Sequence, residues 1–100
     1  MPRKIVLHFE ARLEFEEAID WYEQKEPGLG FKFEDEVHAA FQKILKDPER
    51  FRLVGPTTRK ARVEVFDKYS IYFHVEPSFI GVVSIFHGSR DPAELRPRLR

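Results

Sequence analysis

The sequence predicts an α+β domain in the order β-α-α-β-β-β, with an antiparallel sheet covered on one face by a helical hairpin and a short C-terminal helix. Apolar residues recur with helical spacing in the first half of the chain, whereas in residues 59–87 they largely alternate with a period of two. Helices that precede a group of strands in this way are typical of α+β domains. One hundred residues suffice for a single modest core, so we expect one domain over residues 1–100.

The first strand and both helices are predicted from short stretches of the N-terminal half. Residues 5–9, IVLHF, are apolar and partly β-branched, which is typical of a strand. A helix is expected over about residues 10–25 and a second over about 30–46, because each carries one apolar stripe. The stripes consist of Ala11, Phe15, Ala18 and Tyr22, and of Phe33, Val37, Ala40 and Ile44. The break between them, EPGLG at 26–30, is short enough for an antiparallel hairpin.

Three further strands are predicted in the second half, over residues 59–66, 70–76 and 80–87. The short breaks between them favour antiparallel hairpins. The last run, IGVVSIFH, is apolar on both faces, as in a central strand. We expect the first strand of the chain to pair with this last strand or with its neighbour.

The C-terminal stretch carries the signals of a short helix. Asp91 is a candidate N-cap, Pro92 suits the first helical position, and Glu94 lies three residues after the cap. Pro97 limits the length of this helix. Capping does not explain Gly88, and we expect its flexible backbone to turn the chain beside the sheet.

The composition excludes several classes of protein and site. The chain has no cysteine, which excludes a disulfide framework and a thiol nucleophile and fits a reducing compartment. The four histidines, His8, His38, His74 and His87, have no metal-ligand spacing, and no glycine-rich phosphate loop is present. We therefore expect no metal and no cofactor. No window is long enough to cross a bilayer, so we expect a cytoplasmic protein without membrane contact.

The formal net charge of zero conceals a division between the two halves. Residues 1–50 contain eight Lys or Arg and twelve Asp or Glu, a net charge of −4, whereas residues 51–100 contain nine and five, a net charge of +4. Such asymmetry often marks a binding surface. The alternative is that acidic helices and a basic sheet neutralise each other.

The ordered set of motifs resembles the RelE/ParE superfamily of type II toxins. It consists of a strand, an acidic helical hairpin, R-x-x-R-V-x-V-F, Y-S-I-Y-F-x-V and a closing H-G-S-R-D-P, and it extends from Val6 to Leu99. The closing motif, with His87 before Arg90-Asp91-Pro92, is most similar to the ParE branch. This resemblance implies a toxin of a toxin–antitoxin system, often for plasmid stabilisation and growth inhibition, and a cognate antitoxin.

The resemblance implies two possible activities. ParE-like members bind and block DNA gyrase, whereas RelE-like members cleave mRNA on the ribosome without a metal. Cleavage needs a base, an acid and cations, and the candidates here are Arg62, His87 and Arg90. Residues 70–77 carry no Lys or Arg where the nuclease branch often has a catalytic cation, and the net charge is zero. We therefore favour target binding, with the nuclease and a degenerate, antitoxin-binding member as alternatives.

The candidate target-binding residues are three cations of the strand predicted at 59–66 and two residues at the end of the last strand. They are Arg59, Lys60, Arg62, His87 and Arg90. In a three-stranded meander the third strand ends at the same edge of the sheet as the first strand of the meander. We therefore expect Arg62, near the end of that strand, rather than Arg59 to face His87. We also expect Arg90 to be exposed. The plainer alternative is that Arg59, Lys60 and Arg62 are solvated residues at the start of a strand. His87 would then be a histidine that ends a strand without a functional role.

Two aromatic residues near the hairpin are candidates for binding the antitoxin. They are Trp21 and Phe31, which would line a groove for the antitoxin chain. The alternative is that both lie at the rim of the core.

Overall fold

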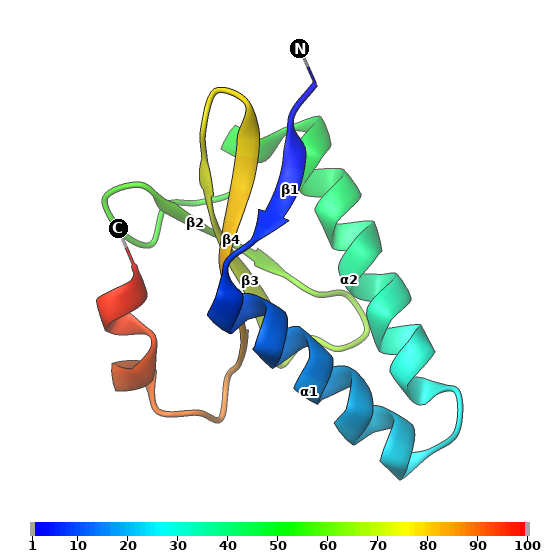
Figure 1. Cartoon of the computed structure of the whole chain (residues 1–100). Coiled ribbons are helices and arrows are strands. Elements are labelled where there is room, and N and C mark those ends of the chain that lie inside the picture. Colours follow the sequence, from blue (N-terminus) through cyan, green and yellow to red (C-terminus); the bar gives the residue numbers. More distant parts are fainter. Residues whose placement is uncertain (1, 100) are drawn as a thin grey trace.

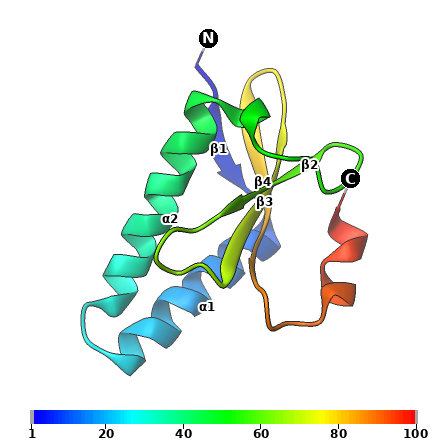
Figure 2. The same ribbon diagram turned by 180° about the vertical axis from the view of Figure 1, so that it is seen from behind.

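The computed structural model describes residues 2–99 and contains a four-stranded sheet in the order β1-β4-β3-β2 (Figure 1). Its elements are β1 (Lys4–Leu7), α1 (Phe9–Lys25), α2 (Leu29–Lys46), β2 (Thr58–Arg62), β3 (Tyr69–Val75) and β4 (Phe79–His87). The element order and the α+β class are those that the sequence predicts. Seen from behind, the sheet lies between α2 and the C-terminal segment (Figure 2).

The sheet is mixed rather than wholly antiparallel. β2, β3 and β4 form the predicted antiparallel meander, but β1 pairs in parallel with β4, from Lys4 opposite Phe79 to Leu7 opposite Val82. The chain leaves β1, passes through the helical hairpin and the meander, and returns beside it as β4. The pairing of the first strand with the last is therefore confirmed, and the parallel direction is the part of the sheet that the sequence pattern did not predict.

Two strands end clearly earlier than predicted. β1 ends at Leu7 rather than at residue 9, because α1 begins at Phe9. β2 ends at Arg62 instead of extending to residue 66, because Val65 adopts a φ of 70° in the left-handed region. That conformation is unfavourable for a β-branched residue and cannot continue a strand. Residues 63–68 instead form the turn into β3, in which the Tyr69 amide donates to the Phe66 carbonyl at 2.9 Å.

The core lies between the helical hairpin and one face of the sheet. Both predicted stripes contribute, through the buried side chains Ala11, Phe15 and Ala18 and through Phe33, Val37, Ala40 and Ile44. They pack on Ala61, Ile71, Phe73, Ile80, Val82 and Ile85 of the sheet. The single core covers one face of the sheet, so the opposite face is left to the C-terminal segment.

The turn between the helices is held by one carboxylate. Glu23 of α1 accepts hydrogen bonds from the amides of Gly28, at 2.8 Å, and Gly30, at 2.9 Å. It thereby satisfies amides at the start of α2, where the N-cap residue, Gly28, has no side chain that could do so. Gly28 has a φ of 91°, and a Cβ on Gly30 would lie 2.6 Å from the carbonyl oxygen of Ile19.

The C-terminal segment contains two 3-10 turns, Pro92–Glu94 and Arg96–Arg98, in place of a regular helix. The predicted cap is present, because the Asp91 carboxylate accepts a hydrogen bond from the Ala93 amide at 2.9 Å. The chain does turn at Gly88, where the Arg90 amide donates to the His87 carbonyl at 3.1 Å. This turn uses no positive φ, which among the glycines of residues 2–99 only Gly28 has.

We expect Gly30→Ala to lower the free energy of unfolding by about 1–3 kcal/mol, because the new methyl group would press on the backbone of α1. Gly88→Ala is the control, since its Cβ would meet only the Lys68 carbonyl at 3.4 Å. That variant should stay within about 0.5 kcal/mol of the wild type. Chemical denaturation measures both, and equal stability of the two variants would contradict the close helix contact.

Candidate functional site

A cleft of about 520 Å³ opens between α1 and the last residues of β4. β1 pairs with β4 only as far as Val82, so the edge of residues 83–87 has no neighbouring strand. Side chains from three parts of the chain line the cleft there: Leu13, Glu14 and Trp21 of α1, Tyr69, Ile85 and His87 of the sheet, and Arg90 and Arg98 of the C-terminal segment.

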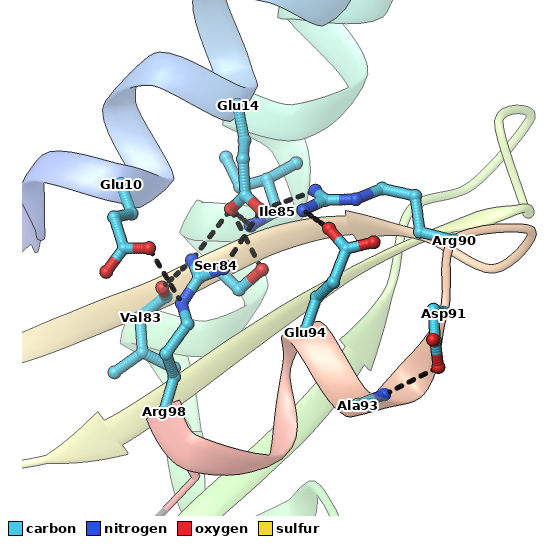
Figure 3. A network of polar contacts seen from close by, with 10 residues as sticks. All are labelled: Glu10, Glu14, Val83, Ser84, Ile85, Arg90, Asp91, Ala93, Glu94 and Arg98. Carbon is cyan, nitrogen blue, oxygen red and sulfur yellow. Dashed lines mark hydrogen bonds and ion pairs between the residues drawn. The ribbon is translucent and has the colours of Figure 1, made fainter.

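Side chains replace the missing strand along this edge (Figure 3). Glu14 accepts hydrogen bonds from the Ser84 hydroxyl at 2.9 Å and from the Ile85 amide at 3.1 Å. Arg98 donates to the carbonyl of Val83. Buried backbone groups must be paired, and here a carboxylate and a guanidinium pair them.

Two arginines neutralise Glu14. Arg98 binds it in a bidentate manner, with Nη2 at 2.9 Å from Oε1 and Nη1 at 3.1 Å from Oε2. Arg90 donates from Nη1 to Oε2 at 2.6 Å and from Nη2 to Glu94 at 2.8 Å. The side chains of Glu14 and Arg98 are only 12% and 14% exposed, so this is a largely desolvated ion pair.

The arginines keep the carboxylate charged despite its burial. Burial alone would raise the pKa of Glu14, but its hydrogen bonds with Arg98, Arg90 and Ser84 outweigh burial, and the pKa lies below its usual value. Burial also lowers the pKa of Arg90, but the bonds to Glu94 and Glu14 prevail and raise it. The cluster is therefore an ion-paired support for the edge of β4 at neutral pH.

His87 lies at the end of β4, beside Tyr69, with 4.9 Å between the ring centroids. Its Nδ1 accepts a hydrogen bond from the Ser89 amide at 3.0 Å and is 2.7 Å from the Ser89 hydroxyl. A neutral His87 consequently carries its proton on Nε2. Burial, followed by the neighbouring Tyr22, raises the pKa of Tyr69, so its hydroxyl stays protonated at neutral pH.

A second depression, which we call the cationic groove, adjoins the cleft at His87. It has a volume of about 400 Å³ and is lined by Lys60, Arg62, Asp67, Lys68, Ser70, His87, Gly88 and Ser89. Arg62 pairs with Ser70, which pairs with Phe86, so the register brings the end of β2 to the end of β4. Arg62 and His87 thus share one groove, as the meander geometry predicts.

The remaining candidate cations have structural contacts. Arg59 donates from Nη1 to the carbonyls of Phe51, at 2.6 Å, and Glu49, at 3.2 Å, which ties the preceding loop to β2. Lys60 lines the groove but lies over the Tyr72 ring, 5.7 Å from its centroid. Of the three cations in β2, Arg59 is the one that does not reach the groove.

Arg90 is less exposed and more constrained than the sequence suggests. Its guanidinium lies 4.4 Å from the centroid of the Phe86 ring, in addition to its ion pairs with Glu14 and Glu94. It lines the cleft rather than projecting from the sheet as an unpaired cation. The expectation of an exposed Arg90 is corrected accordingly.

The two aromatic candidates lie in different surroundings. Trp21 is 52% exposed, lines the cleft and carries the Lys25 ammonium 4.7 Å from its ring centroid. Phe31 is 66% exposed in the first turn of α2, and it is not part of the cleft. Neither side chain belongs to the buried core cluster.

Sequence reasoning missed Glu14 and Arg98, which hold the site together. A signal was present, because Glu14 lies three residues after Ala11 and four before Ala18, on the buried stripe of α1. A carboxylate on an apolar stripe requires a cationic partner, and the C-terminal RPRLR was the place to look for it.

Comparison with known proteins identifies the family. Residues 5–92 match the family described as ParE toxin of type II toxin-antitoxin system, parDE. The chain belongs to this family. Toxin RelE1 of Caulobacter vibrioides (strain ATCC 19089 / CIP 103742 / CB 15) is 27% identical over 89 residues, which cover 88% of this chain and 96% of that protein. The matched family thus carries the name ParE, and this relative carries the name RelE1.

A solved structure supports the same fold. The chromosomal ParDE TA system from P. aeruginosa contains a chain that superposes with a TM-score of 0.73 at 14% identity, covering 86% of this chain and 96% of that one. Within residues 2–99, no helix has the length and apolar character needed to cross a membrane.

We expect Glu14→Gln to lower the free energy of unfolding at pH 7 by about 2–4 kcal/mol, because Arg98 loses its close carboxylate partner and Arg90 keeps only Glu94. The pKa of Glu14 is lower in the folded state than its unfolded value of about 4.3. Its contribution is therefore complete above that value and disappears as the pH falls through the folded pKa. Denaturation curves measured from pH 7 to pH 2 should show that the free energy of unfolding falls less steeply with decreasing pH in the variant than in the wild type. The control is Glu10→Gln, which should leave the stability at pH 7 nearly unchanged.

We expect Arg98→Ala to lower the free energy of unfolding by about 2–3 kcal/mol and Arg90→Ala to lower it by only about 1 kcal/mol. Arg98 supplies the bidentate ion pair with Glu14 and the hydrogen bond to Val83, whereas the loss of Arg90 leaves Glu14 still paired with Arg98. Thermal and urea unfolding measure the difference. The reverse order of stabilities would show that Arg90 is the main partner of Glu14.

Proposed function

We propose that this toxin inhibits growth by binding an essential cellular target through the cationic groove, and that a cognate antitoxin neutralises it. DNA gyrase is the target that the ParE resemblance implies. The observation that carries the proposal is that some of the cations are paired with carboxylates and others are not. Arg90 and Arg98 are neutralised by Glu14, whereas the side chains of Arg62 and Lys68 make no hydrogen bond or ion pair with other residues in 2–99. Unpaired cations in a groove are suited to an acidic partner surface.

The geometry favours binding over bond cleavage. Cleavage of RNA requires a base, an acid and a cation around one phosphate. Arg90 already has two carboxylate partners, and Tyr69 keeps its proton at neutral pH. β3 presents Tyr72 and His74 where a further catalytic cation would stand. These facts support a target-binding toxin.

One observation favours the second candidate function, a ribosome-dependent mRNA endoribonuclease. His87 lines the same groove as Lys60, Arg62 and Lys68. In this alternative the ribose 2′-OH would attack the phosphate and lose its proton to water, while the Nε2 proton of His87 would be given to the leaving 5′ oxygen. Arg62 would stabilise the negative charge on the non-bridging phosphate oxygens. Arg90 would then act only as a positioning residue.

We propose that the antitoxin docks at the cleft beside α1, where Trp21 and Leu13 expose apolar surface at 52% and 39%. A segment that folds on binding would cover such a surface. Glu10 and Glu17 also line the cleft and would favour a basic segment. Phe31, which lies across the hairpin turn in the first turn of α2, would extend this contact if the antitoxin wraps around the turn.

The decisive experiment reverses the unpaired charges. We expect Arg62→Glu combined with Lys68→Glu to reduce growth arrest and inhibition of DNA supercoiling by gyrase at least about tenfold, since an interfacial charge would become repulsive. Arg12→Glu combined with Lys32→Glu is the matched control, with the same change of net charge on the exposed side of the helices. This control should retain wild-type toxicity.

The alternative function predicts a different set of results. Cleavage of ribosome-bound mRNA by the wild type, without an effect on gyrase, would contradict gyrase binding. His87→Ala would then abolish cleavage. Under the binding proposal, purified toxin leaves ribosome-bound mRNA intact.

A further inference from the structure

Two histidine rings meet in a second cleft of about 630 Å³, which shares the lining residues Glu10 and Arg98 with the candidate site. The Nε2 atoms of His8 and His74 lie 3.3 Å apart, although the residues are 66 positions apart in the sequence. His8 immediately precedes α1, and His74 belongs to β3. Glu10, Glu76, Thr58 and Arg98 also line this cleft.

The ring of His74 is held in a defined orientation. Its Nδ1 is 2.8 Å from the Glu76 carboxylate, which fixes the proton on Nδ1 and leaves the Nε2 lone pair directed at His8. The ring lies directly over Gly81 of β4, where a Cβ would come within 2.6 Å of its Cε1 atom. Only a glycine at this position of β4 makes room for the ring.

His8 is fixed through its backbone. Its amide donates to the Val82 carbonyl at 2.9 Å, and its carbonyl accepts from the Arg12 amide at 3.0 Å. These bonds anchor it at once to the sheet and to the first turn of α1. Both imidazoles are thus attached to rigid elements, as a preorganised ligand pair requires.

We propose that His8 and His74 form a bis-histidine binding site for a divalent transition metal ion, namely Zn²⁺. Two nitrogens bound to tetrahedral Zn²⁺ at about 2.0–2.1 Å lie roughly 3.3–3.4 Å from each other. The observed separation of 3.3 Å matches this value. Glu76 completes the arrangement in which a carboxylate orients a metal-binding histidine through its other nitrogen.

The ligand set determines the expected affinity and selectivity. No group of three or more His, Cys, Asp or Glu residues within the described part of the chain is placed to hold a metal, so water must complete the coordination. With two protein ligands we expect a Kd on the order of 1–100 µM, well above that of four-ligand zinc sites. Mg²⁺ and Ca²⁺ should not bind, since they require oxygen ligands.

A metal at this position would link the start of α1 to β3. It would bind the native chain and not the unfolded one, in which the two residues are far apart, and would raise the melting temperature. This inference rests on the two rings and their supports and is independent of the proposed toxin mechanism.

The primary test uses the wild-type full chain without a histidine tag. Zn²⁺ is titrated while the imidazole nitrogens of all four histidines are observed by long-range ¹H–¹⁵N NMR. We expect the Nε2 resonances of His8 and His74 to change together, with those of His38 and His87 unaffected. Changes at His38 or His87 instead, or no change at millimolar Zn²⁺, would overturn the proposal and leave a simple hydrogen bond between the rings.

Variants test the ligands separately. His8→Gln and His74→Gln should each weaken Zn²⁺ binding at least tenfold by calorimetry, and Glu76→Gln should weaken it about tenfold or more through loss of ring orientation. The matched control is His38→Gln, on the exposed part of α2, which should bind like the wild type. Undiminished binding by both ligand variants would contradict the site. If a variant fails to fold, the NMR titration of the wild type decides the matter.

Discussion

The burial of one carboxylate, Glu14, is the constraint on which the arrangement of the second half of the chain depends. β4 is longer than its neighbour β1, because the chain leaves the sheet at Leu7 to enter α1. The exposed edge of β4 would be open to pairing with another chain. Glu14 and Arg98 occupy this edge and satisfy its amide and carbonyl groups.

A buried carboxylate destabilises a fold unless it is fully paired, and this determines the course of the C-terminal segment. Arg98 and Arg90 must both return to α1, across 84 and 76 residues, to neutralise Glu14. Two 3-10 turns with prolines direct the chain between them. The segment beyond β4 is therefore a structural part of the domain, although it forms no regular helix or strand.

The elements that local chemistry determines could be predicted from the sequence. The helical stripes, the period-two strands and the Asp91 cap all depend on neighbouring residues, and the structure contains them. The end of β2 could not be predicted, because the positive φ of Val65 contradicts the preference of its residue type. The parallel direction of β1 is likewise a consequence of the tertiary path of the chain and has no local signal.

The candidate site shows the same division between local and long-range information. The proximity of Arg62 and His87 follows from strand order and register alone, so it could be deduced before the structure was known. The contacts of Arg90 could not, because its partner Glu14 stands among the other glutamates of α1 and differs from them only by its place on the buried stripe.

The division of charge between the two halves of the sequence now has a physical interpretation. Acidic α1 partly neutralises the basic C-terminal segment through Glu14 and its two arginines, so part of that asymmetry is internal. Within residues 2–99, Arg62 and Lys68 beside the β2–β3 turn have no ion pair, and Asp67 is the one carboxylate that lines their groove. Charges closer than the Debye length of about 8 Å at physiological salt act together on a partner. A protein of zero net charge can thus present a local positive field, and that field lies where His87 ends β4.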